Sequence, residues 1–128
     1  MKITGVFITK EKEYPKDIDI GGFDEVIIKT QSPSVYQRYL SAAEARNEVI
    51  YVQDDDCIVD WRELLKVYNG QLTNGITAHH KAAYEGTGIT LVGWGCFFPK
   101  AMLGVFSQYI SRWGVDPMLL READRVFT

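Results

Sequence analysis

The stretch Val49-Ile50-Tyr51-Val52-Gln53-Asp54-Asp55-Asp56 joins a strand-like pattern directly to an acidic cluster. Its first four residues are β-branched or aromatic, which is typical of a parallel strand that is buried on both faces. Three consecutive aspartates follow at once. In open α/β sheets, ligands bind beyond the carboxyl ends of the strands. The stretch therefore predicts a central strand with an acidic binding site at its end.

Segments on both sides of this stretch alternate between strand-like and helix-like patterns. Runs of β-branched and aromatic residues predict strands at 3–9, 25–30, 76–79 and 89–92. Capping residues and prolines predict that helices begin at Ser32-Pro33, Asp60, Pro99 and Asp116-Pro117. Alternating strands and helices imply βαβ units. We therefore expect residues 1–128 to form a single α/β domain, with a mainly parallel central sheet flanked by helices.

Helical spacing of apolar side chains predicts which faces are buried. In the helix that begins at Ser32-Pro33, one face carries Val35, Tyr36, Tyr39, Leu40 and Ala43. Trp61 and Trp113 fall on the apolar faces of later helices, so we expect both in the core. Val126 and Phe127 must be covered either by the core or by a second copy of the chain, which leaves a homodimer open.

Composition excludes several classes of function. Hydrophobic residues make up 46% and charged residues 24% of 128 residues, an ordinary globular balance. The formal net charge of −3 gives no basic footprint for nucleic acid. No apolar run approaches the ~18 residues that span a membrane. Cys57 and Cys96 fit no zinc spacing and are expected to be reduced, buried thiols, so we expect a cytoplasmic protein.

The three aspartates carry the first chemical argument. Crowded carboxylates repel one another, and a bound divalent cation removes the repulsion. Side chains alternate along a strand, so Asp54 and Asp56 point to the same side and can hold Mn²⁺ or Mg²⁺, directly or through water. Asp55 points elsewhere and is placed to accept a hydrogen bond from a ribose hydroxyl. The alternative is a solvated acidic turn that helps to cap the helix after Asp60.

Three segments in order resemble the motifs of one enzyme family. The stretch 51–57 resembles the DxD motif of GT-A-fold glycosyltransferases, and the exostosin-like branch also carries a triple aspartate. Gly93-Trp94-Gly95-Cys96-Phe97-Phe98 is similar to the segment that lines the sugar and acceptor pocket of that family. Glu122-Ala123-Asp124-Arg125-Val126-Phe127-Thr128 is similar to its late acidic motif. The resemblance implies a Rossmann-like GT-A fold across nearly the whole chain.

The resemblance also implies roles for individual residues. Asp54, Asp55 and Asp56 would bind the nucleotide-sugar, with Asp54 and Asp56 as metal ligands, and Thr9 and Lys10 occupy the place where the family grips the nucleotide base. Gly93, Trp94 and Gly95 would lie beside the donor sugar. The late carboxylates Asp124 and Glu122 would be the catalytic residues. The donor would be a UDP- or GDP-sugar, and the acceptor is not named by the sequence.

Departures from the family pattern keep other functions open. The chain is shorter than usual members, and Ala123 separates Glu122 from Asp124. The first hypothesis is a metal-dependent glycosyltransferase that transfers a sugar to an acceptor hydroxyl. The second is a nucleotide-sugar-binding module without efficient transfer, and the third is a metal-dependent phosphoryl-transfer enzyme that lacks a P-loop. His79 and His80 are candidate metal ligands, although a pair at a strand end is the preferred interpretation.

Overall fold

The computed structural model describes residues 1–18, 20–56, 60–69, 76–78, 83–84, 89–90 and 92–127. Its main sheet has the strand order β2-β1-β3-β7-β4. The strands are β1 (Ile3–Ile8), β2 (Glu25–Lys29), β3 (Val49–Asp54), β4 (Thr77–Ala78) and β7 (Cys96–Pro99). The short strands β5 (Ala83–Tyr84) and β6 (Ile89–Thr90) pair separately. The expected α/β class is confirmed.

The sheet is mixed, so the expectation of a mainly parallel sheet was wrong. β1 lies between β2 and β3 and runs parallel to both. β7 runs antiparallel to its neighbours β3 and β4. The register places Cys96 beside Val52, near the carboxyl end of β3, so the chain enters β7 from the end where the aspartates lie. α2 and β4 come before β7 in the chain, and β7 then runs back between β4 and β3, which makes it antiparallel to both.

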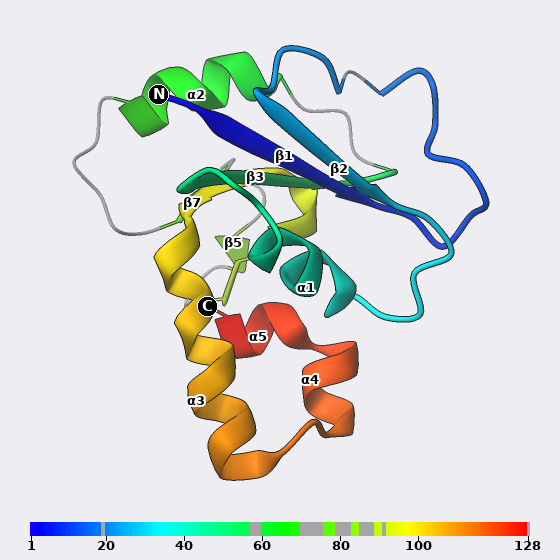
Figure 1. Ribbon diagram of the computed structural model, residues 1–128, viewed down its shortest axis with the longest axis vertical. Helices are drawn as coiled ribbons and strands as arrows, with labels where there is room; N and C mark the ends of the chain where they lie inside the picture. The colour runs from blue at the N-terminus through cyan, green and yellow to red at the C-terminus, as the bar shows by residue number, and fades with distance from the viewer. Residues whose placement is uncertain are drawn as a thin grey trace.

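Helices cover both faces of the sheet (Figure 1). α2 (Trp61–Asn69) lies on one face, and α1 (Gln37–Ala43) lies on the other with α3 (Gly104–Trp113), α4 (Pro117–Arg121) and α5 (Ala123–Phe127). Two short 3₁₀ segments, η2 (Val92–Trp94) and η3 (Lys100–Leu103), flank β7. No helix in the described part of the chain is both long and apolar enough to cross a bilayer.

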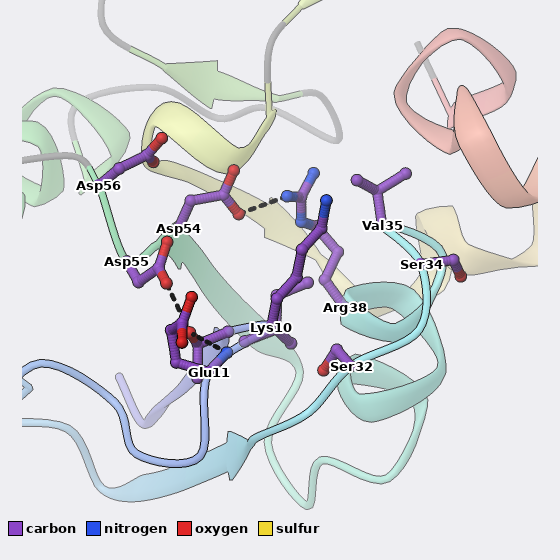
Figure 2. A pocket seen from close by; sticks show the side chains of 11 residues that line it. Lys10, Glu11, Ser32, Ser34, Val35, Arg38, Asp54, Asp55 and Asp56 are labelled. Carbon is purple, nitrogen blue, oxygen red and sulfur yellow. Dashed lines mark hydrogen bonds and ion pairs between the residues drawn. The ribbon is translucent and has the colours of Figure 1, made fainter.

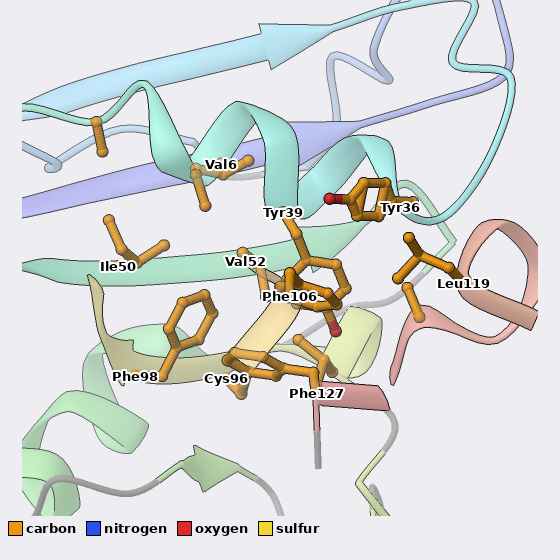
Figure 3. Packing of buried hydrophobic residues seen from close by; sticks show 14 residues of the cluster. Val6, Tyr36, Tyr39, Ile50, Val52, Cys96, Phe98, Phe106, Leu119 and Phe127 are labelled. Carbon is orange, nitrogen blue, oxygen red and sulfur yellow. The ribbon is translucent and has the colours of Figure 1, made fainter. Parts of the chain in front are cut away.

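Side chains that alternate along the strands build a separate core on each face. Val6, Ile50, Val52 and Phe98 point toward α1, where they pack with residues of α3, α4 and α5 (Figure 3). Their neighbours in sequence point to the other face, where the cluster contains Ile3, Phe7, Tyr14, Tyr51, Trp61, Tyr68 and Phe97. Trp61 is therefore a core residue, as predicted. Phe127 is also buried in the first cluster, within its own chain.

Some helix ends agree with the sequence patterns and others do not. Asp116 caps α4 by accepting a hydrogen bond from the Leu119 amide at 2.9 Å, and Gly114 ends α3 with a positive φ of 73°. α1, however, begins at Gln37 rather than at Ser32-Pro33. The Ser32 amide donates to the Thr9 carbonyl at 2.9 Å, which ties this segment to the end of β1 and delays the helix.

The predicted faces of two helices need correction. Leu40 is 48% exposed and Ala43 is exposed, whereas Arg38, Ser41 and Ala42 are buried. Trp113 is 61% exposed and is not a core residue. α1 is rotated relative to the simple apolar stripe, because polar contacts of Arg38 that are not visible in the apolar pattern fix its orientation. In α3 the expected face does pack on the core through Phe106, Tyr109 and Ile110, and Trp113 lies beyond it at the end of the helix.

Candidate functional site

A pocket lies beyond the carboxyl ends of the parallel strands β1 and β3 (Figure 2). It has a volume of about 360 Å³. After β1 the chain forms β2 on one side, and β3 then pairs on the other side, so the pocket sits at a switch point of the strand order. Its lining comprises Ile8, Thr9, Lys10, Glu11, Ser32, Ser34, Val35, Arg38, Asp54, Asp55 and Asp56. This is the position at which open α/β sheets bind ligands.

The acidic triplet forms one wall of the pocket. Asp54 is the last residue of β3, and the Tyr14 hydroxyl donates to its carbonyl at 3.1 Å, which fixes the strand end. The Asp55 carboxylate accepts a hydrogen bond from the buried Thr9 hydroxyl, whose oxygen also accepts from the Glu11 amide at 3.1 Å. Asp56 is exposed at the rim. Asp55 therefore faces the end of β1, while Asp54 turns toward α1 (Figure 2).

Arg38 links the acidic wall to the end of the chain. The residue is only 3% exposed. Its Nη2 forms an ion pair with Asp54, and its Nη1 donates to Asp124 Oδ1 at 2.8 Å. Among the described residues its buried Nε has no hydrogen-bond partner, an arrangement that costs about 1–3 kcal/mol. Two carboxylates from β3 and α5 thus share one buried guanidinium.

Asp124 is held from three sides. Its Oδ1 accepts hydrogen bonds from Arg38 and from the Tyr39 hydroxyl, and its Oδ2 accepts from the Val92 amide at 3.0 Å. The donors come from α1 and η2, which are distant from α5 in sequence. The short helix α5 is therefore attached to α1 and η2 at the site itself.

Gly93 provides the space in which this network fits. A Cβ atom at this position would lie 2.6 Å from Arg38 Nη2, and closer still to the Asp54 carboxylate. Real Cβ atoms do not make such contacts, so any larger residue would displace the ion pair. Gly95 follows with a φ of 102°, a left-handed conformation that favours glycine and turns the chain into β7.

Burial and charge oppose one another in this network. Burial alone lowers the pKa of the Arg38 guanidinium, but the charges of Asp54 and Asp124 outweigh it, so the pKa is raised. Burial raises the pKa of Asp54, with smaller contributions from Asp124 and Asp56, and Arg38 only partly offsets this effect. Burial also raises the pKa values of the Tyr39 hydroxyl and the Cys96 thiol, and the Asp124 charge adds to both effects. Both groups therefore stay protonated at neutral pH.

The charges of the pocket determine which ligands it can hold. Its lining contains four carboxylates, those of Glu11 and the acidic triplet, and two cationic side chains, Lys10 and Arg38. A phosphate group would meet net repulsion here unless a cation entered with it. Asp54 and Asp56 supply oxygen donors to the same pocket, which suits Mg²⁺ or Mn²⁺ shared with the phosphates of a ligand. Within the part of the chain that the structure describes, no group of three or more His, Cys, Asp and Glu side chains could hold such an ion. Two carboxylates are too few to complete the coordination of such an ion, so an ion held by Asp54 and Asp56 would take its other oxygen ligands from water or from a phosphorylated ligand.

The structure brings together several of the predicted site residues. Thr9, Lys10, Asp54, Asp55 and Asp56 line the pocket, and Gly93 and Asp124 lie directly behind Asp54 and Arg38. Glu122 lies outside this group: it is exposed and forms an ion pair with Arg125 at 3.3 Å. The side chain of Trp94, and residues His79, His80 and Cys57, fall outside the described residues. Cys96 is a buried, free thiol, as expected.

Sequence reasoning missed Arg38 and Tyr39. A signal was present: Arg38 shares a helical face with the small residues Ser41, Ala42 and Ala45, which are all buried. An arginine on a face of small, buried residues is expected to have a charged partner, because arginine is almost never fully buried unless it is paired. The apolar pattern up to Leu40 predicts a different face of the helix and therefore does not indicate the face that carries Arg38.

Comparisons with known proteins identify no relative of the chain. No family model, no curated protein sequence and no solved structure matches it.

Proposed function

We propose that this chain is a minimal, GT-A-like glycosyltransferase domain that uses a UDP- or GDP-sugar donor. The observation that supports the proposal is convergence: Asp54, Gly93 and Asp124 belong to three separate motif-like segments, and they surround one guanidinium at the edge of one pocket. Chance resemblance of three short motifs does not require them to meet in space. The location at a switch point of parallel strands adds independent support.

Asp56 and Asp54 are the residues that would hold the metal in this proposal. Asp56 is exposed at the pocket rim, and Asp54 lies deeper, with one of its oxygens paired to Arg38. A bound Mn²⁺ or Mg²⁺ supplies Lewis-acid neutralisation of charge on the departing diphosphate. Thr9 and Lys10, at the other wall, are assigned to the nucleotide.

The proposed reaction exchanges one bond at the anomeric carbon for another. The acceptor oxygen forms a bond to that carbon, and the bond from the carbon to the diphosphate oxygen breaks, with its electron pair leaving on the diphosphate. The acceptor hydroxyl proton passes to solvent. Both Asp124 oxygens are occupied by buried donors, and Asp124 lies behind the pocket lining, so we assign it to balancing the charge of Arg38 behind the acidic wall rather than to proton transfer.

One observation favours a binding module as the second candidate. Neither late carboxylate is placed as a ready proton acceptor, because Asp124 is held by three donors and Glu122 is exposed and paired with Arg125. A domain of this kind would bind the nucleotide-sugar and transfer it poorly or not at all. Release of nucleoside diphosphate from the bound donor separates the two functions.

The decisive experiment is a ligand screen followed by turnover. We expect UDP- or GDP-sugars to raise the melting temperature in the presence of Mn²⁺ and to have little effect in EDTA, because only the folded state binds. Release of nucleoside diphosphate from the stabilising donor would then establish transfer or slow hydrolysis. Absence of stabilisation by every nucleotide-sugar, with and without metal, would refute the proposal.

The first prediction concerns Asp56→Ala. This rim carboxylate has little packing to lose, so the variant should keep its melting temperature within a few degrees. It should lose Mn²⁺-dependent donor binding, which isothermal titration calorimetry measures. Asp17→Ala is the matched control, because Asp17 is exposed and does not line the pocket. Unchanged donor affinity in Asp56→Ala would remove this residue from the site.

A further inference from the structure

Arg38 contacts both proposed halves of the site. Its two terminal nitrogens contact Asp54, at the end of β3, and Asp124, in α5. These contacts span 16 and 86 positions of the sequence. The bridge is therefore a tertiary contact between segments that no local structure holds together.

The two ends of this bridge differ in how firmly they are anchored. Asp124 accepts hydrogen bonds from the Tyr39 hydroxyl and the Val92 amide in addition to Arg38. Asp54 is the last strand residue before the turn that contains Asp55 and Asp56. A planar guanidinium with one nitrogen on each carboxylate transmits the fixed position of Asp124 to the Asp54 side chain.

The packing around the bridge leaves no room for adjustment. Arg38 is 3% exposed, and the backbone of Gly93 closes against both Arg38 and the Asp54 carboxylate. The guanidinium also supplies the positive charge that lets two half-buried carboxylates lie near each other. The acidic wall is thus preorganised before any ligand enters the pocket.

We propose that Arg38 is a positioning residue of this site: it fixes the Asp54 carboxylate against Asp124 and so sets the affinity for the metal-bound donor. The inference rests on the proposed function. It goes beyond that function because it assigns donor affinity to a residue that no motif of the sequence indicated. Arg38 acts through Asp54 and takes no part in bond making or breaking.

Arg38→Lys is the primary test. Lysine keeps the charge, but its single ammonium cannot serve both carboxylates with the planar geometry of the guanidinium. We expect the variant to fold and to bind Mn²⁺ with UDP or with GDP about 10- to 100-fold more weakly than the wild type, the usual effect of losing a partner behind the ligands. Arg46→Ala is the control, because Arg46 is an exposed arginine paired with Glu25 and does not line the pocket.

Chemical rescue separates positioning from general stability. Arg38→Ala leaves a space of guanidinium shape beside the pocket, and millimolar guanidinium should restore most of the lost affinity for Mn²⁺ with UDP or GDP. The same concentration of potassium should not restore it. Affinity is measured well below the melting temperature of each variant, so that a change in stability alone does not alter it. If Arg38→Ala does not fold, the double variant Arg38→Gln/Asp124→Asn replaces it. This variant removes the negative charge of Asp124 together with the guanidinium, so it should fold and bind Mn²⁺ with UDP or GDP as weakly as Arg38→Lys.

The outcomes distinguish this inference from the function on which it rests. If the wild type binds neither nucleotide with Mn²⁺, the proposed function fails and the role of Arg38 fails with it. If the wild type binds and folded Arg38→Lys binds equally well, only the positioning role is overturned. A folded Arg38→Ala that guanidinium does not rescue also overturns it. Weak binding in Arg38→Lys together with rescue of Arg38→Ala would establish it.

Discussion

Gly93 is where the backbone comes closest to the acidic wall. Its φ is not in the left-handed region, so conformational freedom does not explain the glycine. The explanation is space, because a Cβ would overlap the Asp54 carboxylate and Arg38 Nη2. The resemblance placed Gly93 beside the donor sugar, but the sequence did not indicate that a side-chain pair of the same protein lies against its backbone.

The second prediction is that Gly93→Ala destabilises the fold by about 1–3 kcal/mol, the usual effect of inserting a methyl group into a packed site. It should also weaken donor binding, because Asp54 must move. Gly104→Ala is the control: a Cβ there meets nothing within 4 Å, and the position begins α3, so we expect no loss of stability. Chemical denaturation measures the free energy of unfolding of both variants. Equal stability of the two variants would contradict the steric argument.

The third prediction concerns the cost of keeping Asp54 ionised. Burial raises its pKa, so its contribution to stability is fully present below the unfolded-state pKa and is lost as pH rises through the folded-state value. Asp54→Asn does not titrate, and it leaves Arg38 paired with Asp124. The variant should therefore be at least as stable as the wild type at neutral pH, and its advantage should shrink as pH falls to about 4.

Thermal unfolding of both proteins across this pH range tests the prediction. Donor binding provides the contrast, because Asp54→Asn should lose it at every pH. A stability difference that grows as pH falls would reverse the sign and refute the argument.

At the scale of elements, α5 shows how a short helix is fixed in place. Phe127 packs against Tyr39, Phe98 and Phe106, with ring centroids 4.8, 4.8 and 5.6 Å away. These contacts hold the helix that carries Asp124. The sequence predicted that Phe127 is buried either in the core or against a second copy of the chain, and the structure buries it in the core of its own chain.

The fourth prediction is that Phe127→Ala costs about 3–5 kcal/mol of folding free energy, as expected for a buried aromatic ring. In any fraction that remains folded, Asp124 should lose its fixed position and turnover should fall. Trp113→Ala is the control, since that ring is 61% exposed and its loss should change stability by about 0.5 kcal/mol or less. Comparable effects in the two variants would mean that α5 is not anchored through Phe127.

The strands show what could be predicted locally and what could not. β1, β2 and β3 were expected within two residues of their observed ends, because each is a run of β-branched or aromatic residues. β7 was missed. It is four residues long, follows a turn that contains two glycines, and ends at Pro99. Its first three side chains are all buried although they point to alternate faces, so the strand has no alternating pattern of polar and apolar residues. Its antiparallel direction depends on where the chain re-enters the sheet, which no local pattern encodes.

The same distinction applies to the site. The acidic triplet could be placed at a strand end from the sequence, because a buried strand and its polar terminus are adjacent in the chain. The partners of Asp54 could not, because Arg38 belongs to another element and Asp124 lies 70 positions away. Such pairings follow from the packing of α1 and α5 against the sheet, which only the complete fold determines.

For the whole molecule, the bridge through Arg38 affects the order in which contacts form during folding. Contacts between residues far apart in sequence require closure of long loops, and they generally form late in folding. The contact between Arg38 and Asp124 closes a span of 86 positions, whereas β1 and β2 pair across 21. We therefore expect the sheet to assemble before the bridge.

The fifth prediction is kinetic: Arg38→Lys should accelerate unfolding while leaving the folding rate nearly unchanged, because its native contacts are absent from the transition state. Stopped-flow measurements of both rates against denaturant concentration would show this, and a folding rate reduced as much as the unfolding rate is raised would contradict it. If the expectation holds, the proposed binding site is the last part of the protein to form and the first to open. The half-life of the closed site would then be shorter than that of the sheet that supports the site, and bound donor would prolong the half-life of the site.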